Sequence, residues 1–331
     1  MILVTGGAGY IGSHCALALL KLNKEIVIFD NFSTGHKETV DILSKHGKVF
    51  LHEGDLLNYS DINSVFKNYD IDAVIHFAAF SQVGESAKDP QKYYINNVCG
   101  TLNLLKAMLE NGVKQIVFSS TAATYGEPKY IPIDENHPQE PINTYGQTKL
   151  IIEHVLDDYD KAYGLKSVRL RYFNVAGADS NSIIGEWHEP ETHLIPNVLK
   201  STFGEGKTFK LFGDDYDTKD GTCVRDYINV EDLSRAHILA LDYLVKNNCT
   251  NVFNLGTGDG NTVKEVFSTC ETVVGENIPT ETLGRREGDP ATLIADNKKI
   301  KQILNWEPQE SLEHSIQTAY KWECKLQKGL K

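Results

Sequence analysis

Residues 2–12 read ILVTGGAGYIG. A short apolar run, typical of a β-strand, leads into glycines at positions 6, 9 and 12, and a helix-like stretch follows. Glycine permits the tight turn between strand and helix, and it lets backbone N–H groups approach a pyrophosphate at the helix N-terminus. The stretch therefore predicts a strand–turn–helix unit that binds a dinucleotide.

An acidic residue follows at the distance at which such units bind a ribose. Asp30 ends the second strand-like run, 18 residues after Gly12. A carboxylate at this place accepts a hydrogen bond from the ribose 2′-hydroxyl of NAD and repels the 2′-phosphate of NADP. The next residue, Asn31, is not an arginine, which agrees with NAD. The sequence therefore predicts NAD as the cofactor.

Strand-like runs recur along the first half of the chain, with helix-like stretches between them. They are Ile2–Val4, Glu25–Phe29, Val49–His52, Ala73–Phe77, Gln115–Ser119 and Ser167–Phe173. Alternation on this scale indicates βαβ units and a parallel sheet with helices on both faces. Ligands of such sheets bind at the carboxyl ends of the strands. We therefore expect an α/β fold with a Rossmann-type doubly wound parallel sheet.

The length of the chain, 331 residues, is large for a single core. We expect an NAD-binding domain over residues 1–175, to which residues 225–250 return. We expect a smaller C-terminal α/β lobe over residues 176–331 that mainly binds the substrate.

Composition excludes several classes of protein. The formal net charge of −12 disfavours nucleic acid and anionic membrane as partners. The six cysteines are scattered without a CxxC pair, so they indicate reduced packing residues of a cytoplasmic protein, and no metal site is expected. No apolar segment is long enough to cross a bilayer, and the strand-like run that begins at residue 2 leaves no room for a signal peptide.

Tyr145 and Lys149 are four residues apart, so they share one face if this segment is a helix. A phenol is a poor base at neutral pH because its free pKa is about 10, but a neighbouring ammonium and a cationic ligand favour the phenolate. Such a pair is usually a solvated helix face. Here Thr121 ends the fifth strand-like run just before it, which predicts a site where the pair removes a proton from an alcohol.

Two further residues at strand ends have competing interpretations. Asp55 could accept a hydrogen bond from an adenine amino group, or it could be the N-cap of the next helix. His76 closes a buried strand, and a single histidine in that place is more often structural, so we assign it no chemistry.

The order of these motifs resembles that of the extended short-chain dehydrogenase/reductase superfamily, and in particular its UDP-glucose 4-epimerase family. The resemblance covers essentially the whole chain. The stretches that carry it are VTGGAGYIGSH (4–14), HFAA (76–79), VGES (83–86), YYINN (93–97), LRYFN (170–174), DGTCVRDY (220–227) and RREGD (285–289).

The resemblance implies an isomerase with tightly bound NAD. It would epimerise C4 of a UDP-hexose reversibly through a 4-keto intermediate, in galactose metabolism, as a cytoplasmic homodimer. Tyr145 would be the base for the sugar 4-hydroxyl, Lys149 would bind the nicotinamide ribose and lower the pKa of Tyr145, and Thr121 would hydrogen-bond near the 4-oxygen.

The resemblance also implies two sets of binding residues. Those lining NAD would be Gly6, Gly9, Tyr10, Ile11, Gly12, Asp30, Asn31, Asp55, Leu56, Phe77, Ala78, Ala79, Asn96, Thr121, Tyr145, Lys149 and Phe173. Those holding the UDP-sugar would be Thr121, Tyr145, Asn174, His193, Leu194, Phe212, Arg225, Arg286 and Asp289.

Simple chemistry supports a role of Arg225 and Arg286 in binding the diphosphate. Two other positions depart from the family pattern. Guanidinium groups suit the oxygens of a diphosphate, and an acidic protein needs such local donors. Ser81 stands where some relatives carry a lysine near the cofactor phosphates, and His193 stands where some carry asparagine.

Ala122 and Ala123 bear on the choice of reaction. Sugar-nucleotide dehydratases of this superfamily carry acidic residues just after the hydroxyl that follows strand five, and these alanines cannot move a proton. The absence of a nearby cysteine argues against a thiol-type 6-dehydrogenase.

Two alternatives stay open. Leu293 stands at the position that helps to set the volume of the sugar pocket in the family. A leucine there favours UDP-glucose and UDP-galactose, but UDP-N-acetylglucosamine and UDP-pentoses remain alternative substrates. A regulator that senses NAD without catalysis is the alternative of a different class, but it would not need Thr121, Tyr145 and Lys149 together.

Overall fold

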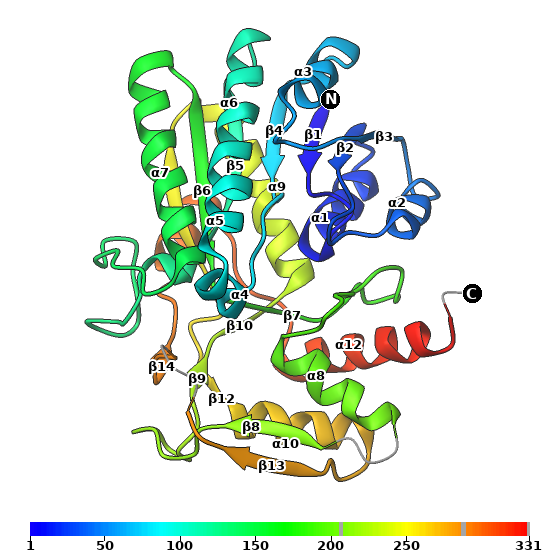
Figure 1. The fold of residues 1–331 in the computed structure, drawn as a ribbon, viewed down its shortest axis with the longest axis vertical. Coiled ribbons are helices and arrows are strands. Elements are labelled where there is room, and N and C mark those ends of the chain that lie inside the picture. Colours follow the sequence, from blue (N-terminus) through cyan, green and yellow to red (C-terminus); the bar gives the residue numbers. More distant parts are fainter. Residues whose placement is uncertain (205–207, 286–288, 330–331) are drawn as a thin grey trace.

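A seven-stranded parallel sheet is the largest unit of the computed structural model, which describes residues 1–204, 208–285 and 289–329 (Figure 1). The strand order is β11-β6-β5-β4-β1-β2-β3. The strands are β1 (Ile2–Thr5), β2 (Ile26–Asp30), β3 (Val49–Glu53), β4 (Ala73–His76), β5 (Gln115–Thr121), β6 (Lys166–Tyr172) and β11 (Asn251–Leu255). The predicted doubly wound parallel sheet is confirmed, and each of the six predicted runs is a strand.

Helices cover both faces of this sheet. One face carries α1 (Tyr10–Lys21) and α9 (Val230–Asn247), and the other carries α3 (Tyr59–Asn68), α6 (Gly100–Glu110) and α7 (Thr144–Tyr163). The shorter elements of this half are α2 (Lys37–Leu43), α4 (Val83–Lys88), α5 (Pro90–Tyr93), the π-helix η1 (Tyr94–Cys99) and the 3₁₀ helix η2 (Ala122–Thr124).

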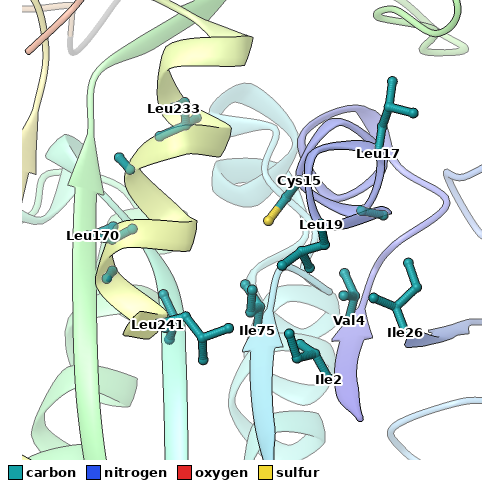
Figure 2. Packing of buried hydrophobic residues seen from close by; sticks show 14 of the residues in the cluster. Ile2, Val4, Cys15, Leu17, Leu19, Ile26, Ile75, Leu170, Leu233 and Leu241 are labelled. Atoms are coloured by element: carbon teal, nitrogen blue, oxygen red, sulfur yellow. The ribbon is translucent and has the colours of Figure 1, made fainter. Parts of the chain in front are cut away.

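The alternation of side chains along the strands explains the two-faced packing. Ile2 and Val4 of β1 pack in the cluster with α1 and α9, whereas Leu3 between them packs in the cluster with α3 and α6. Figure 2 shows Val4 and Ile75 beside Leu19 of α1 in the first cluster. Since both faces are buried, the strands are apolar throughout, as parallel sheets require.

A smaller unit lies at the carboxyl end of the large sheet, below it in Figure 1. Its strands are β7 (Asn174–Ala176), β8 (Phe209–Phe212), β9 (Val224–Arg225), β10 (Tyr227–Asn229), β12 (Asn261–Thr262), β13 (Thr280–Leu283) and β14 (Thr292–Leu293). Its helical elements are α8 (Leu194–Lys200), η3 (Ser201–Phe203), α10 (Val263–Val274) and α12 (Leu312–Gln327). These three α-helices share a separate apolar cluster, which gives the unit its own core.

The chain returns to the large sheet after it has entered the smaller unit. Helix α9 packs on α1, β11 pairs with β6, and α11 (Lys298–Leu304) contacts β11. The sequence did not predict β11, because its partner β6 is almost 80 residues away and local periodicity carries no trace of that pairing. The division of the chain at residues 175 and 176 stays a prediction. Within the described residues, no helix combines the length and apolarity needed to span a membrane.

Candidate active site

A cavity of about 450 Å³ lies at the carboxyl ends of the strands of the large sheet. Its walls come from the segments that follow β1, β2, β3, β4, β5 and β6, and from residues of the smaller unit on the opposite side. This is where ligands bind to open α/β sheets.

The glycine turn after β1 is so tight that a side chain at Gly6 or Gly12 would clash with the backbone. Gly6 has a φ of +70°, and a Cβ there would lie 2.6 Å from the backbone nitrogen of Ala78. A Cβ at Gly12 would overlap the carbonyl oxygen of Gly6, whereas one at Gly9 would meet only that oxygen, at 3.5 Å. The turn therefore holds the start of α1 against the cavity with its backbone exposed there, which fits a pyrophosphate.

Replacement of Gly12 by alanine should disrupt this turn. The added methyl group forces the turn apart, so we expect the free energy of unfolding to fall by about 1–3 kcal/mol and NAD to bind more weakly. Urea unfolding and calorimetric titration with NAD measure the two effects. Gly84→Ala is the control, because a Cβ there meets nothing within 4 Å. Equal effects of the two substitutions would contradict this account of the turn.

Asp30 and Asp55, at the ends of β2 and β3, are fixed by hydrogen bonds. Asp30 accepts from the backbone nitrogens of Ala8 and Phe32, both at 2.9 Å. Burial raises the pKa of Asp30, and these N–H groups oppose that rise. Asp55 accepts from Asn31 Nδ2 at 3.0 Å and from the backbone nitrogen of Leu57 at 2.8 Å. The N-cap of α3 is Asn58, so the alternative interpretation of Asp55 as that cap is wrong.

Tyr145, Lys149 and Thr121 meet in the middle of the cavity wall. Asn143 caps α7 by accepting from the backbone nitrogen of Gly146 at 2.8 Å, which places Tyr145 in the first turn of the helix. Lys149 Nζ donates to the carbonyl oxygen of Ser119 at 2.8 Å and lies 5.9 Å from the centre of the Tyr145 ring. Thr121, at the end of β5, places its hydroxyl near the Tyr145 phenol, where it lowers the pKa of that phenol.

Burial dominates the protonation of this pair in the protein without ligands. Burial raises the pKa of Tyr145 to about 12, although the Thr121 hydrogen bond opposes the rise. Burial lowers the pKa of Lys149 to about 7, although the charge of Glu153 opposes the fall. In the protein alone, burial thus favours the neutral phenol and weakens the ammonium of Lys149. Additional positive charge, such as a cationic ligand brings, is needed to produce the phenolate.

The buried lysine makes stability depend on pH. Between about pH 7 and 10.5 the unfolded state keeps a proton on Lys149 that the folded state has lost, so stability rises with pH in this window. Lys149→Met should raise the free energy of unfolding near pH 7 and remove this contribution, which is at most about 1.4 kcal/mol per pH unit. Urea unfolding across the window tests this. Lys161→Met is the control because Lys161 is 77% exposed, and an identical pH profile for wild type and Lys149→Met would contradict the prediction.

A buried ion pair lies one helical turn beyond Lys149, and sequence reasoning missed it. Glu153 contacts Nε and Nη2 of Arg171 at 3.0 and 2.6 Å, and it also accepts from the Ser120 hydroxyl. Arg171 Nη1 donates in turn to the Tyr125 hydroxyl at 2.9 Å. Burial disfavours the Glu153 carboxylate, but Arg171 outweighs it and lowers the pKa. Ser120, which donates to Glu153, is adjacent on β5 to Ser119, whose carbonyl oxygen accepts from Lys149. The ion pair therefore fixes the part of β5 to which Lys149 is bonded.

His76 is engaged at both ring nitrogens. Nδ1 lies 2.6 Å from the Thr5 hydroxyl and Nε2 lies 2.9 Å from the Thr101 hydroxyl, and burial lowers the pKa of the imidazole to about 3. The histidine therefore stays neutral and ties β4 to β1 and α6, in agreement with the prediction that it is structural.

The far end of the cavity belongs to the smaller unit. Arg225 is 8% exposed, forms an ion pair with Asp289 and donates to the carbonyl oxygen of Val224 at 2.8 Å. Leu293 of β14 also lines the cavity there. This end combines a guanidinium with a partner that an anionic ligand could displace.

Four residues near α8 form a further cluster that sequence reasoning found only in part. His193 was predicted to bind substrate, but its neighbours Glu186, His188 and Glu191 were not. Burial opposes the charged form of both imidazoles. The two carboxylates outweigh it and raise the pKa of His188 to about 9 and that of His193 to about 10. The local spacing H-x-x-E-x-H is the signal that could have found the cluster.

The structure brings the predicted site residues together with two exceptions. All of the residues predicted to line NAD also line this cavity, and so do Asn174, His193, Leu194, Arg225 and Asp289 from the substrate set. Phe212, at the end of β8, is not among the lining residues. Arg286 lies outside the described residues.

Known proteins resemble this chain over nearly its full length. The family model described as GDP-mannose 4,6 dehydratase matches residues 3–319, so the chain carries this domain. The UDP-glucose 4-epimerase of Rhizobium leguminosarum bv. trifolii is 50% identical over 98% of this chain and 97% of its own. The structure of the Brucella ovis UDP-glucose 4-epimerase in complex with NAD is 45% identical, with a TM-score of 0.92 and 97% of each chain covered. That of the Bifidobacterium longum enzyme with NAD⁺ and UDP is 38% identical, with a TM-score of 0.94 and 99% of each chain covered.

The fold, the glycine turn and the juxtaposition of Tyr145 with Lys149 define a member of the extended short-chain dehydrogenase/reductase superfamily. Its sugar-nucleotide branch includes both dehydratases and epimerases. The full-length similarity then decides between them, and the chain belongs to the UDP-glucose 4-epimerase family.

Proposed function

We propose that this protein interconverts UDP-glucose and UDP-galactose with NAD as a bound cofactor. The observation that carries the proposal is one continuous cavity. It is lined by the glycine turn, Asp30 and Tyr145 of the large unit and by Arg225 of the smaller unit. A dinucleotide bound against the large unit and a nucleotide sugar bound against the smaller unit would meet beside the Tyr145 phenol.

The residues present fit NAD. A glycine turn that is closed to side chains exposes backbone at the start of α1, and Asp30 offers a carboxylate at the end of β2. Gly6, Gly9 and Gly12 would hold the pyrophosphate, Asp30 the adenosine ribose and Lys149 the nicotinamide ribose. NAD, when bound, supplies the acceptor and later the donor of a hydride.

Tyr145 would move the proton of the sugar 4-hydroxyl. Its hydroxyl oxygen takes that proton when the alcohol is oxidised and returns it when the ketone is reduced. Thr121 would orient the same oxygen through its hydrogen bond to the phenol. Arg225 would hold the substrate by its diphosphate, while Asn174, Leu194, His193 and Asp289 would complete the binding site. Anchoring at the diphosphate leaves the sugar free to present either face.

The carboxylates of the cavity favour epimerisation over elimination of water. Those among the described lining residues are Asp30, Asp55, Glu186 and Asp289, and each is already engaged with another protein group. Beside Thr121 the wall consists of Ala122 and Ala123. Among the described lining residues, the cavity thus offers reversible oxidation at one carbon but no unengaged carboxylate beside Tyr145 for an elimination.

A substrate panel tests the function. The protein should convert UDP-galactose to UDP-glucose without added reductant and release no free NADH. UDP-N-acetylgalactosamine and UDP-arabinose, run in parallel, measure how far Leu293 restricts the sugar. Bound NAD without any conversion would instead support a regulator, and release of a 4-keto-6-deoxy sugar would support a dehydratase.

We further propose that the protein works as a homodimer in the cytoplasm. Apolar side chains on η1 and the start of α6 are exposed, with Tyr94, Ile95 and Leu102 at 38, 42 and 37%. A second copy would bury them through the helices of the large unit. A single-chain mass in sedimentation equilibrium would refute the dimer, and recovery in a membrane fraction would refute the location.

A further inference from the structure

Glu186, His188, Glu191 and His193 form a compact set of metal-ligand atoms. Each offers one atom, and the four atoms lie within 4.8 Å of one another. The set is contained in the segment between β7 and α8, and His193 is the residue that precedes α8. The two glutamate side chains are 7% and 4% exposed, so two carboxylates are held away from water beside two imidazoles.

Ion pairs and hydrogen bonds within the set engage only some of its ligand atoms. His193 Nδ1 lies 2.7 Å from Glu186 Oε1, and Glu191 Oε1 accepts from the backbone nitrogens of Thr192 and His193 at 2.7 and 2.9 Å. Two buried atoms, His188 Nδ1 and Glu191 Oε2, have no hydrogen-bond partner in the described structure. His188 Nδ1 is 3.2 Å from Glu186 Oε1 and 3.8 Å from Glu191 Oε2, near both but aligned with neither.

Buried polar atoms without a partner are costly and call for an explanation. Lys200 does not supply one, since its Nζ remains 3.9 Å from Glu191 Oε2. A cation between the four ligand atoms would engage both unpaired atoms at once. The ion would displace one proton from each imidazole, and the two carboxylates would then balance the charge of a divalent ion.

We propose that Glu186, His188, Glu191 and His193 form a binding site for a divalent transition-metal ion of the zinc class. Imidazole nitrogens and carboxylate oxygens are zinc ligands at about 2.0–2.2 Å, and tetrahedral geometry then separates the ligand atoms by about 3.4 Å. The observed separations, from 2.7 Å up to the limit of 4.8 Å, bracket that value.

The ion would be structural rather than catalytic. Four protein ligands complete a tetrahedral shell and leave no position for water or substrate. Three of the four residues also line the cavity, and the His188 ring stands edge-on to Tyr10, 6.2 Å between ring centres. The ion would therefore brace the cavity wall where the segment before α8 faces the start of α1.

Cobalt(II) and zinc(II) binding test the proposal on the full chain with Cys99 and Cys249 replaced by serine, because these two exposed thiols could bind metal. We expect one ion per chain, an intense visible absorption typical of tetrahedral cobalt, and a zinc-dependent rise of the thermal midpoint. His188→Gln and Glu191→Gln should each weaken binding by at least about 100-fold. His314→Gln, on a surface histidine 3.5 Å from Glu310, should change nothing.

Two results would overturn the proposal. One is no saturable binding of cobalt or zinc at one ion per chain. The other is binding that persists unchanged in both cluster variants, which would place the ion elsewhere. Neither result depends on turnover, so the metal site and the epimerase function can fail separately.

Discussion

Tyr145→Phe is expected to lower kcat for UDP-galactose by about 10²–10⁴-fold. Phenylalanine keeps the buried ring but removes the one oxygen that can take and return the proton of the sugar hydroxyl. The ring position should persist, since Asn143 still caps α7 and the Tyr145 backbone nitrogen still donates to Ser86 at 3.1 Å. Conversion of UDP-galactose to UDP-glucose under saturating substrate measures the loss.

Two companion measurements make this result specific. The variant should keep bound NAD, which absorbance after denaturation reports. Tyr163→Phe, at the exposed far end of the same helix, should turn over like the wild type. Undiminished activity of Tyr145→Phe would remove Tyr145 from the chemistry, whereas loss of NAD would show that the tyrosine acts in binding instead.

Glu153→Ala is expected to cost about 3–5 kcal/mol of unfolding free energy, the largest stability effect that we predict. The Glu153 and Arg171 side chains are only 2% and 6% exposed, so removal of the carboxylate leaves a buried guanidinium without its counter-charge. Urea unfolding at constant pH measures the change in the midpoint and the free energy.

Two controls separate this cost from simple loss of a charge. Glu53→Ala breaks an exposed pair with Lys37 and should cost at most about 1 kcal/mol. Replacing both buried partners, as Glu153→Leu with Arg171→Met, should cost less than Glu153→Ala because no lone charge remains. A double variant no more stable than the single one would contradict the buried-charge explanation.

The parts of the site that were predictable are those written in short local patterns. The glycine turn, Asp30 at a strand end and Tyr145 four residues before Lys149 each depend on spacing within one strand or helix. The parallel sheet then brings them together, because the ends of neighbouring strands meet at one edge. Local spacing therefore located the glycine turn, Asp30 and the Tyr145–Lys149 pair, whereas the family resemblance implied most of the other lining residues.

The parts that escaped prediction depend on pairing across long distances or on burial. Arg171 of β6 meets Glu153 of helix α7, and nothing in the sequence around either residue indicates an ion pair. The high pKa of Tyr145 comes from desolvation, which spacing does not report. Glu186, His188, Glu191 and His193 lie within eight residues, but only the fold shows that their side chains turn toward one another.

The position of β11 at the edge of the large sheet has a consequence for synthesis on the ribosome. When β6 leaves the exit tunnel, the strand that will cover its free edge has not yet been translated, because β11 begins only at Asn251. Until then the nascent chain exposes a row of unpaired backbone groups, which is a template for association with other chains. The backbone pairing of β11 with β6 later covers this edge. The edge of β6 therefore stays unpaired until β11 has been synthesised. During that interval the growing polypeptide needs protection from association with other chains.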